Sequence, residues 1–196
     1  MIRLGLFALV ASTLALLPNQ GASGQEKKKP AWFVKSVKKI EATLEPAEAK
    51  PGQTVTFKLT VDLNEGYHTY PTVQPDPAAE PYVNMLKFPA AGSVIFVGKT
   101  SDPKDYDSKA DEFIKAKEVR FISGAATYTR KVVVSPKAAA GMLEVKLDEF
   151  RLQVCDKTTC FPGLKIDVAA KLKVLDGPAV PVEKDFAEEV NKALEK

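Results

Sequence analysis

Hydrophobic and polar residues alternate along much of the chain, and this pattern predicts β-strands. The clearest run is 54–63, where every second residue from Val55 to Leu63 is hydrophobic and the residues between are polar. A period of two is typical of a strand with one buried face. Shorter apolar or alternating runs, separated by Pro, Gly and Asn residues, lie at 85–88, 94–97, 118–122, 127–134, 143–147, 150–154, 164–168 and 172–175.

Helical periodicity is found only near the C-terminus. Phe186, Val190 and Leu194 recur at four-residue spacing and predict a short amphipathic helix after a Pro-containing linker. Many short strands and one terminal helix favour an all-β fold, an immunoglobulin-like antiparallel β-sandwich with a short C-terminal helix. We assign 35–176 to this domain and 177–196 to the linker and helix.

The first residues have the pattern of a secretory signal. Arg3 precedes an apolar stretch, 4–17, and small residues at 21–24 provide a cleavage site. A membrane anchor is the alternative, but the stretch is shorter than the ~20 residues that span a bilayer. We therefore expect a signal peptide at 1–24, a flexible charged leader at 25–34, and a mature chain without a membrane span that is periplasmic or otherwise secreted.

Composition excludes one class of partner. The formal net charge is only +3 in 196 residues, and the basic residues are spread along the chain. Proteins that bind nucleic acid concentrate Lys and Arg in a patch or stripe. We therefore expect no nucleic-acid partner.

The two cysteines of the chain, Cys155 and Cys160, lie in a short loop between the predicted strands 150–154 and 164–168. In an exported protein such a pair indicates a disulfide or a redox couple. Closing so short a loop removes roughly 2 kcal/mol of unfolded-state entropy, against about 4.7 kcal/mol for a hundred-residue loop. The bond therefore adds little to stability, whereas an exposed hairpin loop is accessible to an attacking thiolate. A structural bridge and a redox couple both remain open.

Other chemistry has few candidate residues. A closed metal site needs four ligands, and the chain offers two cysteines and one histidine, His68. The sequence leaves the role of His68 open between a packed or surface side chain and a ligand or base. No Gly-rich phosphate loop, G-x-S-x-G or C-x-x-C motif occurs. We expect no metal and no cofactor.

One long segment has no strand periodicity. Residues 101–117 are polar and charged, and they contain the triplet Asp111, Glu112 and Phe113. A stretch of this length without regular structure is typical of a functional or a disordered loop.

The cysteine loop resembles a known family. The run Val-Cys-Asp-Lys-Thr-Thr-Cys-Phe-Pro at 154–162, preceded by Gly-Tyr-His-Thr-Tyr at 66–70, is similar to the N-terminal periplasmic domain of the thiol:disulfide interchange protein DsbD. The resemblance covers most of 35–175. It implies an immunoglobulin-like sandwich whose cysteine pair cycles between dithiol and disulfide.

The resemblance also implies unequal roles for the site residues. Cys160 would be the attacking cysteine that faces partners, and Cys155 the resolving one. Asp111, Glu112 and Phe113 match the cap that shields the pair, and the aromatic residues beneath the cap are matched by two residues, Tyr67 and Tyr70.

The implied partners are redox proteins. A thioredoxin-like domain or membrane thiol reductase would supply electrons, and extracytoplasmic disulfide proteins in cytochrome maturation or disulfide isomerisation would accept them. The family's membrane and C-terminal thioredoxin-like domains are absent from the sequence, so we expect a free-standing module. The alternative is a non-enzymatic secreted β-sandwich that binds a ligand and carries an inert Cys155–Cys160 bridge.

Overall fold

A computed structural model describes residues 29–195. The predicted signal peptide, 1–24, and the first part of the leader lie outside the described residues. The helices are α1 (Ala31–Ser36), the 3₁₀ helix η1 (Pro77–Ala79) and α2 (Lys184–Leu194). The strands are β1 (Val37–Glu45), β2 (Glu48–Ala49), β3 (Thr54–Leu63), β4 (His68–Thr69), β5 (Met85–Lys87), β6 (Val94–Ser101), β7 (Asp107–Asp111), β8 (Ala116–Ser123), β9 (Ala125–Val134), β10 (Gly141–Lys146), β11 (Glu149–Leu152), β12 (Val154–Cys155), β13 (Leu164–Ile166) and β14 (Ala169–Val174).

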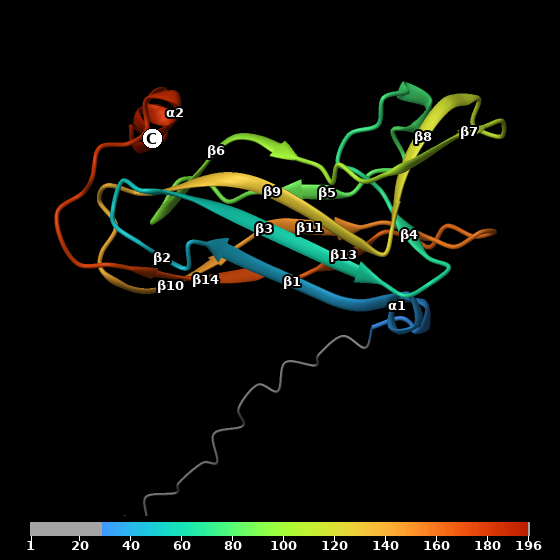
Figure 1. Ribbon diagram of the computed structural model, residues 1–196, viewed down its shortest axis with the longest axis horizontal. Helices are drawn as coiled ribbons and strands as arrows, with labels where there is room; N and C mark the ends of the chain where they lie inside the picture. The colour runs from blue at the N-terminus through green and yellow to red at the C-terminus, as the bar shows by residue number, and fades with distance from the viewer. Residues whose placement is uncertain (1–28, 196) are drawn as a thin grey trace, which may run out of the picture.

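The strands form a sandwich (Figure 1). One layer is a four-stranded sheet with the order β1-β3-β9-β6. The facing layer consists of two three-stranded sheets, β10-β14-β2 and β13-β11-β5. Strand pairs are antiparallel except for the short parallel pair of β2 with β14. The predicted all-β sandwich with a C-terminal helix is confirmed.

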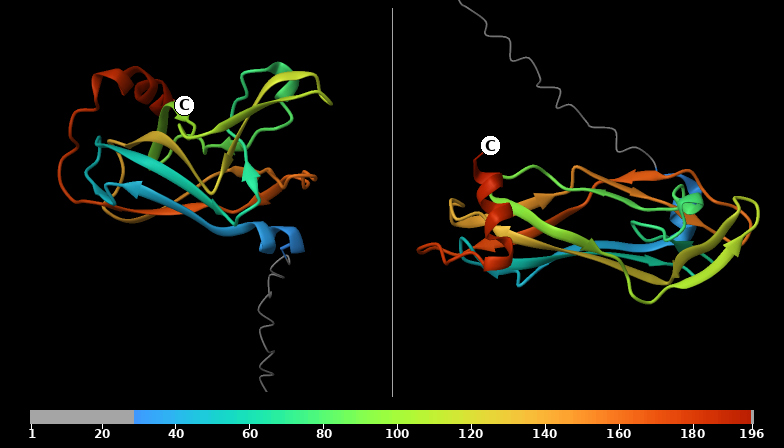
Figure 2. Two further views of the ribbon diagram at one scale, coloured as in Figure 1. Left: turned by 45° about the vertical axis from the view of Figure 1, so that its right-hand side comes forward. Right: turned by 90° about the horizontal axis from the view of Figure 1, so that it is seen from above.

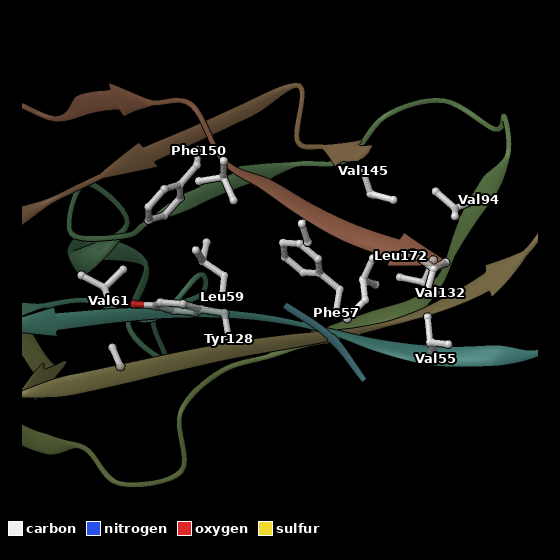
Figure 3. Close-up of a cluster of buried hydrophobic side chains, with 14 of the residues drawn as sticks. Val55, Phe57, Leu59, Val61, Val94, Tyr128, Val132, Val145, Phe150 and Leu172 are labelled. Atoms are coloured by element: carbon white, nitrogen blue, oxygen red, sulfur yellow. The ribbon is translucent and has the colours of Figure 1, made fainter. Parts of the chain in front are cut away.

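The core lies between the two layers (Figure 3). The alternating side chains of β3 point into it, with Phe57 and Leu59 fully buried. They meet Tyr128 from β9, Phe150 from β11 and Leu172 from β14. Burial of a large apolar side chain contributes about 1.5–3 kcal/mol, so this shared core holds the two layers together.

A fourth sheet, with the order β12-β4-β8-β7, lies at one end of the sandwich. Strands β8 and β9 are consecutive in the chain, and Gly124 between them has a φ of 72°. Glycine adopts this left-handed conformation without steric cost, so the chain leaves the sandwich layer here and β8 continues beside β4. Figures 1 and 2 show the resulting β7–β8 hairpin projecting from the sandwich.

The structure differs from the sequence prediction for residues 101–117. The segment is not one aperiodic loop, because 107–111 form β7 and pair with β8. The side chains of β7 are exposed on both faces except for the partly buried Asp111. A strand without a buried face has no hydrophobic alternation, which is why the sequence pattern did not reveal it.

The end of the predicted leader also differs. Residues 31–36 form helix α1, and Phe33 within it is buried in the main core. The prediction of a flexible segment is therefore wrong for residues 31–34. Six residues are too few for a stable isolated helix, so tertiary packing of the aromatic side chains fixes this segment.

Helix α2 is confirmed near its predicted position. Val190 is buried against Ile95 and Val97 of β6, on the outer side of the sandwich (Figure 2). The Gly98 backbone N–H donates to the Glu189 carboxylate at 3.0 Å. Within residues 29–195, no helix combines the length and the apolar character needed to cross a membrane.

Candidate functional site

The two cysteines form a disulfide at the neck of a hairpin loop. As the sequence predicts, the flanking strands β11 and β13 are hairpin partners, and the structure places Leu152 opposite Leu164. Beyond this pair the chain forms β12, and Cys155 lies opposite His68 of β4. The cysteine loop is thus attached both to the sandwich and to the end sheet.

The two cysteines are unequally exposed. Cys155 is only 1% exposed, whereas Cys160 is an exposed residue. Cys160 is therefore the cysteine whose surface is open to a molecule outside the protein, and Cys155 is covered. The attacking and resolving roles that the family resemblance implies for the two cysteines stay a prediction.

Asp156 shapes the turn between the cysteines. Its Oδ1 atom accepts from the backbone N–H groups of Thr158 and Thr159, both at 2.8 Å. These hydrogen bonds, first that of Thr158, lower the pKa of the Asp156 carboxyl. A side chain that accepts from the backbone two and three residues ahead is the usual means of closing a turn of this size. Asp156 is therefore a turn-forming residue of the loop.

Tyr70 lies beneath the disulfide. Its hydroxyl donates to Cys155 Sγ at 3.0 Å and lies 3.6 Å from Cys160 Sγ. The side chain is buried, and this burial, followed by the charges of Tyr82 and Asp111, raises the pKa of its phenol. Tyr70 therefore stays protonated and offers a hydrogen bond to the sulfur that leaves when the disulfide opens.

His68 extends this chain of contacts. Its Nε2 atom lies 3.2 Å from the Tyr70 hydroxyl, and its ring lies 5.0 Å from that of Phe121. Burial, and then the charge of Lys109, lower the pKa of His68, while Asp156 acts in the opposite direction. Residues i and i+2 of an extended segment share a face, so the spacing of His68 and Tyr70 was the available sequence signal. The structure places His68 in the site.

A cleft of about 240 Å³ lies over the disulfide. Besides the residues already described, it is lined by Tyr82, Lys109, Asp111, Val119 and Phe121. A second hollow of about 660 Å³ shares His68, Lys109, Phe121 and Lys157 with the cleft. The sequence analysis missed Tyr82, Lys109 and Phe121, because they come from separate segments that no local motif joins.

The predicted cap residues lie around the tip of the β7–β8 hairpin. Asp111 lines the cleft, and its Oδ1 accepts from the backbone N–H of Phe113 at 3.0 Å. Glu112 is exposed, and the Phe113 side chain is 94% exposed, so it does not pack on the disulfide in this arrangement. The shielding role of Phe113 and Glu112 stays a prediction.

Tyr67 belongs to a different aromatic group. Its ring lies 6.4 Å from that of Phe161, the residue after Cys160, and Trp32 of α1 stacks on the same ring. Of the two predicted aromatic residues, Tyr70 thus contacts the sulfurs, and Tyr67 packs on the side of the cysteine loop. Trp32 was not among the sequence candidates, because it lies far from the loop along the chain.

A buried polar network holds these elements in place. Asn84 Nδ2 donates to Thr69 Oγ1 at 2.8 Å and to the Tyr70 carbonyl at 2.9 Å, and its Oδ1 accepts from the Gln153 N–H at 2.7 Å. Tyr128 also donates to the Tyr70 carbonyl at 2.6 Å. Asn84 therefore fixes β4, which carries Tyr70, relative to the segment that leads into Cys155.

The arrangement suits thiol chemistry. In the part of the chain that the structure describes, no three His, Cys, Asp or Glu side chains gather in a way that suits a metal ion. The chemically distinctive features are an exposed sulfur, a buried sulfur with a phenol donor, and an imidazole connected to that phenol.

Among known proteins, similarity to this chain is found in solved structures. No family model and no curated protein matches the chain. Among solved structures, the N-terminal periplasmic domain of ScsB from Proteus mirabilis is similar, with 16% sequence identity and a TM-score of 0.38. The match covers 76% of this chain and 51% of the ScsB chain. This protein therefore spans about half the length of the ScsB chain it matches.

Proposed function

We propose that this protein is an exported thiol:disulfide interchange module, in which Cys155 and Cys160 cycle between disulfide and dithiol. The observation that carries the proposal is the unequal environment of the two sulfurs. Cys160 is exposed to partners, while Cys155 is buried and accepts a hydrogen bond from Tyr70. An exchanging disulfide needs one sulfur open to attack and a stabilised leaving sulfur, and this bond has both.

A purely structural role fits the geometry less well. Strands β11 and β13 on either side of the loop are already paired, and β12 is paired with β4. The bond closes a very short loop, so its entropic contribution to stability is only roughly 2 kcal/mol. The resemblance of 154–162 to the DsbD N-terminal domain adds independent support for exchange.

The proposed reaction is a pair of thiolate displacements. A partner thiolate attacks Cys160 Sγ, a bond forms between the two sulfurs, and the bond to Cys155 Sγ breaks with its electron pair left on Cys155. A second partner thiolate then displaces Cys160 from the mixed disulfide, leaving the dithiol form here and a disulfide in the partner. In the return direction Cys160 attacks an acceptor disulfide, and Cys155 resolves the resulting mixed disulfide. Two electrons pass in each cycle.

The partners follow from the family resemblance. We propose a thioredoxin-like domain or a membrane thiol reductase as electron donor, and extracytoplasmic disulfide proteins of the isomerisation or cytochrome maturation pathways as acceptors. The proposed location is the periplasm or another extracytoplasmic compartment, where thiol–disulfide couples of this kind operate.

A redox titration tests the function. The protein would be equilibrated with glutathione buffers, and the fraction of dithiol would be measured by alkylation and mass shift. We expect a potential between roughly −180 and −270 mV, the range of exchanging couples. A value well below about −300 mV would mark an inert bridge and favour a β-sandwich binding module.

A further inference from the structure

The buried sulfur of Cys155 has no direct access to solvent. Cys155 is 1% exposed, and the side chain of Tyr70, which hydrogen bonds to it, is 4% exposed. Yet the sulfur must gain a proton whenever the disulfide is reduced to a dithiol, and lose it before Cys155 attacks again, since the thiolate is the nucleophile. A path for this proton is therefore needed.

The path consists of two consecutive contacts and a partly exposed end. Within residues 29–195, the hydrogen-bond partner of Cys155 Sγ is the Tyr70 hydroxyl, at 3.0 Å. That hydroxyl lies 3.2 Å from His68 Nε2. His68 is half-buried and lines both the cleft over the disulfide and the adjoining 660 Å³ hollow, so its ring reaches solvent.

We propose that His68, acting through Tyr70, conducts protons between solvent and the buried sulfur of Cys155. This inference rests on the proposed exchange function. Tyr70 is the catalytic residue of the pair, because it touches a reacting sulfur. His68 is a positioning residue, which orients the phenol and exchanges its proton.

Protons and electron pairs are conserved in both directions of the exchange reaction. When Cys155 resolves a mixed disulfide, its thiol proton moves to the Tyr70 oxygen while the phenol proton moves to His68 Nε2. The Cys155 thiolate then attacks Cys160 Sγ, the Cys160–partner bond breaks, and the partner leaves as a thiolate with the electron pair. His68, now an imidazolium, releases its proton to solvent. In the reductive direction the same steps run in reverse and deliver a proton to the Cys155 thiolate.

The groups around His68 suit a proton acceptor. Lys109 of β7 and Lys157 of the cysteine loop bring positive charge to the two hollows, and Asp111 and Asp156 bring negative charge, while β8 contributes the apolar Phe121. Burial, and then Lys109, lower the pKa of His68 more than Asp156 raises it. The imidazole is therefore neutral near pH 7, which is the form that accepts a proton.

Thiol labelling of the reduced protein has two phases, which report the attack by Cys160 and the resolution by Cys155 separately. When the reduced protein reacts with 5,5′-dithiobis(2-nitrobenzoate), attack by Cys160 releases one thionitrobenzoate, and resolution by Cys155 releases a second. General base catalysis typically contributes 10²–10⁴-fold, so we expect His68→Gln to slow the second phase by about tenfold or more at neutral pH. The wild-type rate should also rise through an inflection that His68→Gln lacks.

Further variants and an NMR titration make the test specific. Tyr70→Phe should slow the second phase as much as His68→Gln, and the double variant should be no slower than Tyr70→Phe, because the residues act in series. Lys109→Gln should move the inflection to higher pH. His68 is the only histidine of the chain, so its proton NMR titration should show the same pKa and the same displacement in Lys109→Gln.

The outcomes are decisive and distinguishable. An unchanged second phase and inflection in His68→Gln, or an inflection that does not follow the NMR titration, would overturn the relay. A wild-type protein that releases no second thionitrobenzoate at any pH would instead overturn the exchange function itself. Circular dichroism serves in every variant as the check that the domain is folded.

Discussion

The indole of Trp32 lies parallel to the ring of Phe161, with 5.1 Å between ring centroids and 1° between their planes. Phe161 follows Cys160 directly, and its backbone N–H donates to the Val154 carbonyl at 2.9 Å. A residue of α1 is thereby held against the loop that carries the disulfide. A movement of that loop on reduction would therefore change the surroundings of the Trp32 ring.

This contact makes the only tryptophan of the chain a reporter of the redox state. We expect the fluorescence of Trp32 to change when dithiothreitol opens the disulfide, because the loop that holds Phe161 is then released from its bridge. The change should be smaller in Phe161→Leu, which removes the stacked ring. In a Cys155→Ser, Cys160→Ser double variant, dithiothreitol should have no effect. An identical response in all three proteins would show that Trp32 does not sense the loop.

The unequal exposure of the cysteines predicts unequal reactivity. In Cys155→Ser the remaining Cys160 thiol is exposed and should form a mixed disulfide rapidly with a small aromatic disulfide. In Cys160→Ser the remaining Cys155 thiol is buried, and we expect its reaction to be slower by about a hundredfold or more, since it needs local opening. Absorbance of the released thiol measures both rates. Equal rates would contradict the assigned roles.

Phe113 provides a test of the predicted cap. Because its side chain is 94% exposed, Phe113→Ala should change the free energy of unfolding by less than about 0.5 kcal/mol. In the arrangement described, it should also leave the rate at which small disulfides oxidise the reduced protein unchanged. Stopped-flow measurement of that rate decides the question. A faster rate in Phe113→Ala would establish that the hairpin tip closes over the sulfurs and shields them.

The Asn84 network predicts a large loss of stability. Asn84 is 1% exposed, and Asn84→Leu leaves the Gln153 N–H buried without its acceptor. Since each unsatisfied buried group costs about 1–3 kcal/mol, we expect urea unfolding to show a loss of about 2–4 kcal/mol. Asn64 is a matched control, because it is exposed and donates one hydrogen bond to the Lys35 carbonyl. Similar losses in Asn84→Leu and Asn64→Leu would remove the special role of the network.

The regular part of the fold was predictable from local pattern. Val55 to Leu63 alternate in the sequence and are buried alternately in β3, because a strand with one face on a core must repeat with a period of two. Phe186, Val190 and Leu194 likewise predicted α2. Strand β7 and helix α1 were not predictable in this way, because β7 has no buried face and α1 is held by distant aromatic contacts.

The candidate site, too, was predictable from local sequence only in part. Only four residues lie between Cys155 and Cys160 in a predicted hairpin, so the sequence by itself determined their pairing and indicated thiol chemistry. Which sulfur is buried, and that His68 reaches it through Tyr70, depends on β4 lying between β12 and β8. The contact between Tyr70 and Cys155 joins residues 85 positions apart in the chain. Pairing between such distant segments is set by the packing of the whole sandwich, and only the tertiary structure decided it.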